Sequence, residues 1–280
     1  MKSLLRLPNS WNVKGVKRII LLLLLSITGG FGQERQFPFR LSPQTEFSIL
    51  IGNVALAGSN SVLRGSLQVP EPEQILLLDK DRLFFIDRVT YQPFNHSVER
   101  ASHYMMLSAI SLPLLLAPLC QSGGELFTLG VIGLETYMTT YLTIQTLKLL
   151  TRRPRPVMYS NDYNISEYKG IQSLNSFPSG HAAMAFSAAG FIHACYLAFL
   201  PKGILYSVLK YTTYAAALSA GFLRYRSGVH HLTDVIVGSA IGYALGYVIP
   251  QLHAKNTNNQ RLSISLDPFH YGRLSVQVKF

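Results

Sequence analysis

Residues 232–249 read LTDVIVGSAIGYALGYVI, and this stretch decides how the chain must fold. It is long enough to cross a bilayer once as a helix, and it carries no charged side chain after Asp234. Gly238, Gly242 and Gly246 recur at every fourth residue, a spacing that lets two transmembrane helices bring their backbones close together. The stretch therefore predicts a membrane-spanning helix packed tightly against a neighbour.

Four further apolar stretches extend this interpretation to a bundle of helices. They are residues 105–120, 126–150, 182–200 and 204–223. Residues 46–63 are helical in pattern, but two asparagines, two glycines and three serines leave it open whether they cross. The predicted fold class is all-α, a polytopic transmembrane bundle with five to six spans.

The composition supports this class and excludes others. Apolar residues make up 48% of the chain and charged residues 14%, against about 25% charged in a typical soluble domain. An intrinsically disordered chain is excluded, and an ordinary cytosolic enzyme is disfavoured. The net charge is +11, but five of the positive residues precede Ile19. The net charge therefore does not indicate a surface that binds polyanions, and we expect no nucleic-acid partner.

Residues 1–32 have the layout of a secretory signal peptide. A basic region is followed by the apolar run 19–27 and by small residues up to Gly32. The apolar run is too short to span about 30 Å of hydrocarbon as a helix. We expect cleavage near Gly32, with an uncleaved N-terminal anchor as the alternative.

The rest of the chain divides into a lead-in, a core and a tail. In the lead-in, 33–100, the later residues mix apolar and charged side chains at the spacing of short amphipathic helices, interfacial or partly inserted. The core, 101–250, holds the five strongly apolar spans. The tail, 251–280, contains two alternating stretches that predict a β-hairpin.

Three polar clusters occur at the ends of the predicted spans. KLLTRRPRP (148–156) closes one span, SFPSGH (176–181) opens the next, and RYRSGVHHLTD (224–234) joins the last two. Counting the crossings places all three clusters on one side of the membrane. The sequence therefore predicts that they share a pocket.

Each cluster suits the binding of an anion. The first has four positive side chains and no acid, so it sets topology, binds lipid headgroups or clamps a phosphoryl group. The second places Ser179 as the N-cap of a helix whose first-turn amides and dipole favour an anion beside His181. In the third, Asp234 can hold one nitrogen of His230 while the other acts as base or nucleophile, and Arg224 can reach the same pocket.

Together the clusters resemble the three-part signature of the type 2 phosphatidic acid phosphatase family, which shares its site with vanadium haloperoxidases and bacterial acid phosphatases. The matching pattern is Lys148-x6-Arg155-Pro156, Pro178-Ser179-Gly180-His181 and Arg224-x5-His230-x3-Asp234. It covers about 87 residues, and the helical frame extends the likeness over residues 100–250. The family usually has serine where this chain has Leu223, a departure that we expect to tune the pocket.

The resemblance implies a membrane-embedded lipid phosphatase that uses neither a metal nor another cofactor. His230 would attack phosphorus and form a phosphohistidine, with Asp234 orienting it. His181 would protonate the leaving oxygen and then activate water. The groups implied to bind the phosphoryl oxygens are Lys148, Arg155, Arg224 and the amides near Ser179 and Gly180.

Residues outside the signature receive plainer interpretations. Arg152 and Arg153 are assigned to headgroup contact or topology, and Glu135 to hydrogen bonds with neighbouring threonines and tyrosines. Cys120 and Cys195 read as buried, inert thiols. No Cys/His cluster has zinc-like spacing, so neither a metal site nor a disulfide is expected.

The side of the membrane follows from residues 46–63. If the signal is cleaved and this stretch crosses, the clusters are cytoplasmic; if it dips in or lies flat, they face the periplasm. Its polar content favours the second case. We therefore expect a bacterial inner-membrane protein whose site faces the periplasm.

The implied substrates are lipid phosphates or diphosphates in the membrane: phosphatidate, phosphatidylglycerol phosphate, a polyprenyl diphosphate and lipid A phosphates. A vanadium-dependent haloperoxidase is one alternative, which the multiple spans disfavour because its known members are soluble. A non-catalytic lipid-binding bundle is another, which the ordered presence of three motifs disfavours.

Overall fold

The computed structural model describes residues 36–68, 77–159, 170–199, 203–255, 261–266 and 274–279. The chain forms two units, Met1–Phe37 and Pro38–Phe280, and every element described below belongs to the second. The expected signal peptide lies outside the described residues.

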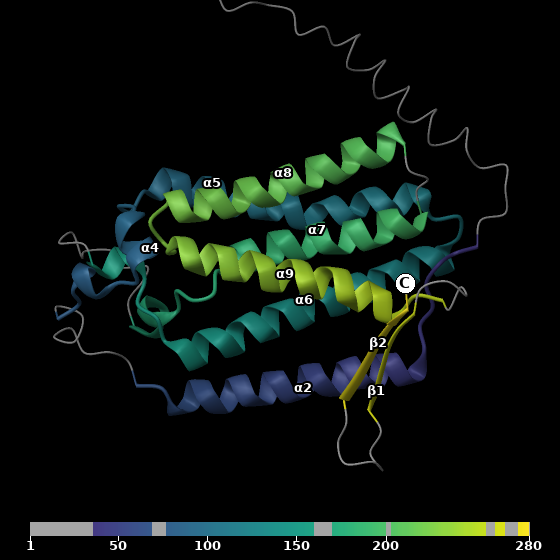
Figure 1. Ribbon diagram of the computed structural model, residues 1–280, viewed down its shortest axis with the longest axis horizontal. Helices are drawn as coiled ribbons and strands as arrows, with labels where there is room; N and C mark the ends of the chain where they lie inside the picture. The colour runs from purple at the N-terminus through teal and green to yellow at the C-terminus, as the bar shows by residue number, and fades with distance from the viewer. Residues whose placement is uncertain are drawn as a thin grey trace, which may run out of the picture. The chain divides into compact units, whose positions relative to one another are not determined.

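Six long helices of the second unit pack side by side as a bundle (Figure 1). They are α2 (Pro43–Ser66), α5 (His96–Ser111), α6 (Gly123–Thr151), α7 (Gly180–Phe199), α8 (Ile204–Arg226) and α9 (Leu232–Leu252). The 3-10 helix η2 (Leu112–Leu119) continues α5 beyond Pro113. The shorter elements are η1 (Lys80–Arg82), α4 (Phe85–Val89), η3 (Pro156–Tyr159) and η5 (Gly170–Leu174). The all-α bundle predicted from the sequence is confirmed.

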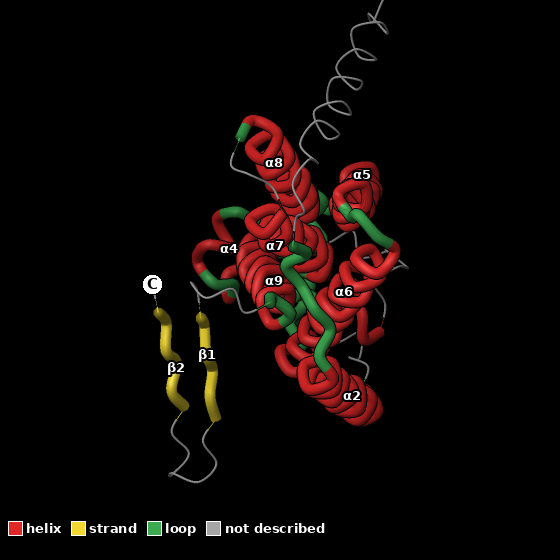
Figure 2. Tube along the Cα trace, turned by 90° about the vertical axis from the view of Figure 1, so that its right-hand side faces the viewer, coloured by secondary structure: helices red, strands yellow, loops and turns green. Residues whose placement is uncertain are grey.

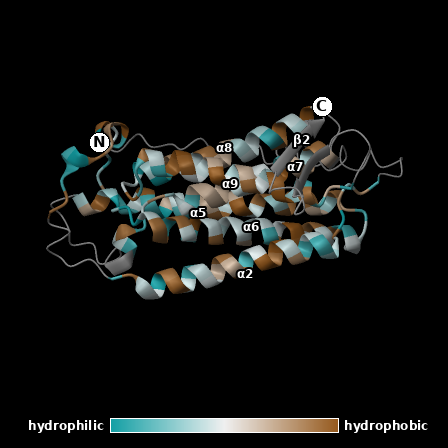
Figure 3. Ribbon diagram, turned by 60° about the horizontal axis from the view of Figure 1, so that its bottom comes forward, coloured by the Kyte–Doolittle hydropathy of each residue, from teal (hydrophilic) through white to brown (hydrophobic). Residues whose placement is uncertain are grey.

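The surface of the bundle is that of a membrane protein. Within the described residues, His96–Leu119, Gly180–Ala198 and Leu232–Leu252 are long and apolar enough to cross a bilayer. The helices α2, α6 and α8 lie alongside them (Figure 2) and expose large apolar side chains such as Phe47, Phe127 and Phe222. Apolar residues are spread along the outward helices (Figure 3). Such an apolar outer surface is suited to contact with the lipid of a membrane.

The closest packing in the bundle joins α9 to α7. A Cβ atom at Gly242 would lie 2.0 Å from the carbonyl oxygen of Ala183, and one at Gly246 would lie 2.1 Å from that of Ser187. A Cβ at Gly238 would meet the Ser179 carbonyl oxygen at 2.4 Å. The glycine repeat therefore allows the close helix packing that its spacing predicts, because no larger residue fits between these backbones.

Helix α2 runs the whole length of the bundle beside α6 (Figures 1 and 3). Its start adjoins the end of α9, where the Lys255 amide donates to the Pro38 carbonyl at 2.7 Å. At its other end, Arg152 Nη2 donates to the Gln68 carbonyl at 2.8 Å. This course differs from the expectation that residues 46–63 dip in or lie flat, because α2 passes from one end of the bundle to the other.

Several polar side chains of α2 have hydrogen-bond partners in the bundle or on their own helix. Asn60 Nδ2 donates to the carbonyl oxygen of Leu142 on α6 at 3.2 Å. The hydroxyls of Ser48, Ser59 and Ser61 donate to carbonyl oxygens of their own helix. Polar content therefore does not keep this helix out of a membrane, since these donors are satisfied without water.

The tail contains the strands β1 (Arg261–Leu266) and β2 (Leu274–Lys279). They pair antiparallel, with Arg261 opposite Lys279 and Leu266 opposite Leu274. The connection expected between them, residues 267–273, lies outside the described residues.

The contact between α7 and α9 gives a test of the fold. We expect Gly242→Ala to destabilise the protein by about 1–3 kcal/mol, because the added methyl group overpacks the Ala183 backbone. Thermal unfolding in detergent should show a lower midpoint. Gly130→Ala on α6 is the matched control, since a Cβ there meets nothing within 4 Å. Equal midpoints for the two variants would contradict the proposed packing.

Candidate active site

The three polar clusters meet at one end of the bundle. The first lies at the end of α6, the second at the start of α7, and the third between the end of α8 and the start of α9 (Figure 1). The α7–α9 contact sets these ends in register, because the Ser179 amide donates to the Asp234 carbonyl oxygen at 2.9 Å. The shared pocket predicted by counting crossings is therefore present.

His230 lies at the centre of this end and is only 2% exposed. Its Nε2 is 3.3 Å from Arg155 Nη1. Burial lowers the pKa of His230 well below its usual 6.5, and the positive charges of Arg155, Arg224 and Lys148 lower it further. The imidazole is therefore neutral at pH 7 and keeps a lone pair for attack or proton abstraction.

Asp234 is fully buried and held by groups other than His230. Its Oδ2 accepts from Ser176 Oγ at 2.5 Å and from the His231 amide at 2.8 Å. His230 Nδ1 lies 3.6 Å from the same oxygen and has no hydrogen-bond partner among the described residues. His230 thus lies near Asp234 from just before the start of α9, but 3.6 Å is longer than a hydrogen bond. Such catalytic contacts are often long without substrate.

Arg153 corrects one sequence assignment. The sequence assigns it to headgroup contact or topology, but Nη1 donates to Asp234 Oδ1 at 2.7 Å and Nη2 to Asp87 Oδ2 at 2.6 Å. Thr233 also donates to Asp87, through its amide and its hydroxyl. Burial alone would raise the pKa of Asp87, but these hydrogen bonds and the Arg153 charge hold it below 3.8. Arg153 thus fixes the Asp234 carboxylate from the side away from His230.

Three buried cations surround His230. Lys148 Nζ donates to the Asn175 carbonyl at 3.1 Å, and Arg155 Nε donates to the Gln172 carbonyl at 2.9 Å. Arg224 Nη1 lies 3.3 Å from Ser102 Oγ. All three residues are at most 8% exposed. Backbone and hydroxyl oxygens orient these side chains, and Arg224 Nη1 also lies 3.7 Å from Glu99 Oε1. Three basic side chains beside this carboxylate leave a site in which a bound anion would be stabilised.

The start of α7 adds donors, although not quite as predicted. The Ser179 amide is occupied by the Asp234 carbonyl, which leaves the amides of the first helical turn from Gly180 onward for an anion. Ser179 Oγ makes no capping bond; it is buried and without a partner among the described residues. A Cβ at Gly180 would lie 3.8 Å from Lys148 Nζ, so this turn borders the cationic cluster directly.

Helix α5 supplies groups that the motifs do not contain. A pocket of about 300 Å³ beside the histidines is lined by Glu99, Arg100, His103, Tyr104, His181 and Arg224. In this pocket His103 Nδ1 lies 3.2 Å from His181 Nε2. The sequence did contain a signal, because Glu99, Ser102 and His103 fall on one face at the start of an apolar helix.

The fold and this pocket define a polytopic helical membrane protein with a buried, cationic anion site around two histidines. The family model described as "PAP2 superfamily" matches residues 129–258. All three motifs lie within the matched residues, so the match confirms the resemblance that they carry.

Two solved structures are similar to the chain. The crystal structure of Aquifex aeolicus LpxE is 23% identical, with a TM-score of 0.41, and the match covers 59% of this chain and 92% of that one. The other is the crystal structure of the first transmembrane PAP2 type phosphatidylglycerolphosphate phosphatase from Bacillus subtilis. It is 18% identical, with a TM-score of 0.41, covering 75% and 94%. No curated protein matches the chain.

The ion pair of Asp87 with Arg153 leads to a pH-dependent prediction. We expect Asp87→Asn to lower stability at pH 7 by about 2 kcal/mol, because two charged hydrogen-bonding contacts are weakened. Since the pKa of Asp87 is below 3.8 when folded, its contribution is present above that pH and is lost as the pH falls below it.

Thermal unfolding over roughly pH 3–7, in an acid-tolerant detergent, measures this effect. The difference in unfolding midpoint between the wild type and Asp87→Asn should become smaller as the pH falls. Asp81→Asn, at an exposed site in η1, is the control and should leave the curve unchanged. A gap that stays constant down to the acid end would contradict the assignment.

Proposed function

We propose that this protein is an integral membrane phosphatase that removes phosphoryl groups from lipid phosphates or diphosphates through a phosphohistidine at His230. The observation that carries the proposal is the buried, neutral imidazole of His230, 3.3 Å from Arg155. A nucleophile in this position would contact a phosphoryl group held by the same arginine. The PAP2 domain supports the same chemistry.

The first step transfers the phosphoryl group to the enzyme. The lone pair of His230 Nε2 attacks phosphorus, and the bond from phosphorus to the leaving oxygen breaks. His181 must take up a proton for this step, and it then gives that proton to the leaving oxygen. Asp234 stabilises the positive charge that develops on the His230 ring, and a shortening of its 3.6 Å separation from Nδ1 would complete that hydrogen bond.

The second step releases inorganic phosphate. His181 takes a proton from water, the water oxygen attacks phosphorus, and the bond between phosphorus and Nε2 breaks. In both steps negative charge develops on the phosphoryl oxygens, where Lys148, Arg155 and Arg224 stabilise it. The Ser179 hydroxyl and the first-turn amides of α7 are further donors.

The position of the pocket supports a lipid substrate. It lies at an end of a membrane bundle and is lined from α5, α7 and α8. Tyr104 lines it and is 67% exposed, and Leu107 and Phe222 expose apolar surface on the same helices. A phosphate headgroup can therefore occupy the pocket while the acyl or prenyl chains stay in the membrane. The candidate headgroups remain phosphatidate, phosphatidylglycerol phosphate, a polyprenyl diphosphate and lipid A phosphates.

We propose that the site faces the periplasm of a bacterial inner membrane. Because α2 runs from one end of the bundle to the other, Pro38 and His230 lie on opposite sides of the membrane. If His230 faces the periplasm, Pro38 is in the cytoplasm. This orientation requires that the apolar run 19–27, which is too short to span, does not cross, so that the five basic residues before Ile19 stay in the cytoplasm with Pro38. A cleaved signal peptide would instead export Pro38 and place the site in the cytoplasm. The expected signal cleavage and the external site therefore exclude each other.

The nucleophile is tested by phosphate release from lipid phosphates in detergent. We expect His230→Ala to lose at least about 10³-fold in kcat, as removal of a nucleophile or its base does in other enzymes. His96→Ala, at an exposed position, is the control and should retain activity. In the wild type, rapid quenching at alkaline pH should trap an acid-labile phosphoprotein.

Two results would overturn this proposal. Phosphate release that survives in folded His230→Ala would exclude His230 as nucleophile. Halide oxidation that requires added vanadate, with no phosphate release from any lipid phosphate, would assign the pocket to haloperoxidase chemistry.

The orientation is tested by cysteine labelling in a chain with Cys120→Ser and Cys195→Ser. We expect Asp81→Cys, near the site, to react with an impermeant maleimide on spheroplasts. Gln121→Cys, at the opposite end of the bundle, should react only after permeabilisation. The reverse pattern would place the site in the cytoplasm and Pro38 outside.

A further inference from the structure

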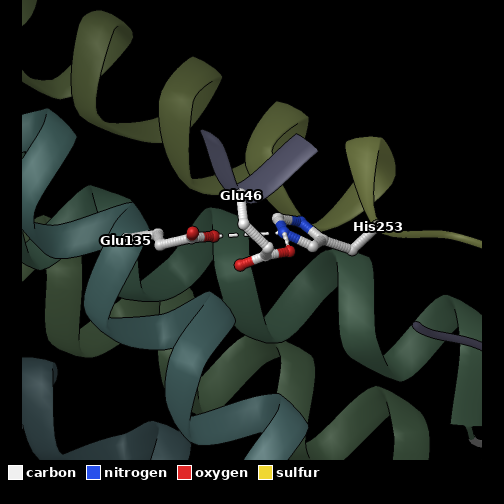
Figure 4. A group of neighbouring side chains, drawn as sticks. All are labelled: Glu46, Glu135 and His253. Carbon is white, nitrogen blue, oxygen red and sulfur yellow. Dashed lines mark hydrogen bonds and ion pairs between the residues drawn. The ribbon is translucent and has the colours of Figure 1, made fainter. Parts of the chain in front are cut away.

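Three side chains from distant parts of the sequence meet away from the catalytic end. Glu46 lies in the first turn of α2, Glu135 lies on α6, and His253 follows the last turn of α9 (Figure 4). His253 Nε2 is 3.1 Å from Glu46 Oε1 and 3.1 Å from Glu135 Oε2. One ligand atom from each residue lies within 4.8 Å of the other two. This contact also corrects the assignment of Glu135 to neighbouring threonines and tyrosines.

The other ring nitrogen of His253 determines what Nε2 can do. His253 Nδ1 lies 3.0 Å from the carbonyl oxygen of Ile249. A carbonyl can only accept, so Nδ1 carries the hydrogen. In the neutral ring Nε2 then presents a lone pair toward the two carboxylates. A backbone carbonyl that fixes the tautomer in this way is a common partner of metal-binding histidines.

Two carboxyl groups share one imidazole in this cluster. Within the described residues, the ion pairs of Glu46 and Glu135 are both with His253. Glu135 Oε2 is buried and has no hydrogen-bond partner in the same part of the chain, despite its 3.1 Å approach to Nε2. Two carboxylates thus face one imidazole in a largely buried position. A divalent cation would neutralise both and use the lone pair.

We propose that Glu46, Glu135 and His253 bind a divalent metal ion with a preference for nitrogen and oxygen ligands, such as Zn²⁺. Around a tetrahedral ion with bonds of about 2.1 Å, the donor atoms lie about 3.4 Å apart. The observed 3.1 Å contacts need only small adjustments to reach that spacing. Three protein ligands leave a fourth position for water.

This ion would be structural rather than catalytic. Glu135 lies thirteen residues before Lys148 on the same helix, which is about 20 Å along the helix axis. The ion would join the start of α2, the middle of α6 and the end of α9. The same region already pairs the lead-in with the tail, because the Arg40 amide donates to the His253 carbonyl at 2.8 Å.

Equilibrium dialysis of the EDTA-stripped, desalted protein against Zn²⁺ tests the proposal. We expect one ion per chain, with Mg²⁺ unable to compete because it prefers octahedral oxygen sites. Glu135→Gln and His253→Gln should each weaken Zn²⁺ binding more than about tenfold, since even outer-shell changes cost that much. His193→Gln, at a histidine that contacts Tyr243 and Tyr214 instead, is the control and should bind as the wild type does.

Thermal unfolding supplies a second readout. Zn²⁺ should raise the unfolding midpoint of the wild type and of His193→Gln, but not that of Glu135→Gln or His253→Gln. Should either buried variant fail to fold, Glu46→Gln at the more exposed ligand replaces it and should show the same loss. Absence of Zn²⁺ binding to the wild type, or unchanged affinity in the ligand variants, would overturn the proposal.

Discussion

The backbone contact between α7 and α9 is the constraint on which the rest of the structure depends. Because Gly238, Gly242 and Gly246 let the two helices approach without side chains between them, the start of α7 is fixed relative to the start of α9. That register brings the turn containing Ser179 against Asp234, so the start of α7 borders the residues that precede α9. In a membrane, where water gives no hydrophobic drive between helices, close van der Waals packing is the force available to hold such a register.

Burying several basic side chains together costs electrostatic free energy, and the surrounding residues explain how this arrangement is maintained. Three cations and a neutral histidine are buried together, an arrangement that favours a bound anion over the empty pocket. The two buried carboxylates nearby already have hydrogen-bond partners. Asp87 accepts hydrogen bonds from Arg153 and Thr233. Asp234 accepts them from Arg153, Ser176 and the His231 amide. Arg153 thereby holds the Asp234 carboxylate in place near His230.

The sequence predicted the bundle, its glycine contact and the convergence of the three clusters, because each depends on local spacing. It did not reveal Asp87, which enters the site from the lead-in without a motif of its own. The face formed by Glu99, Ser102 and His103 was a signal, but it was not recognised. The sequence misjudged Arg153 and Glu135 for the same reason as Asp87: their partners lie 66 and more residues away in the chain. Long-range pairing of single side chains leaves no periodic signal, whereas a helix face or a capped turn does. Residues 46–63 follow the length of the bundle despite their polar content. Serine hydroxyls bonded to their own helix and an asparagine bonded to α6 look the same in sequence as polar groups that need water.

The end-to-end course of α2 has a consequence for the cell. In the proposed orientation, Pro38 lies in one compartment, while phosphate released by the proposed reaction at His230 would appear in the other. A binding partner recruited through the N-terminal segment could therefore follow the enzyme in the membrane without ever meeting its product. The orientation of a single helix thus decides which pool of phosphate the reaction feeds.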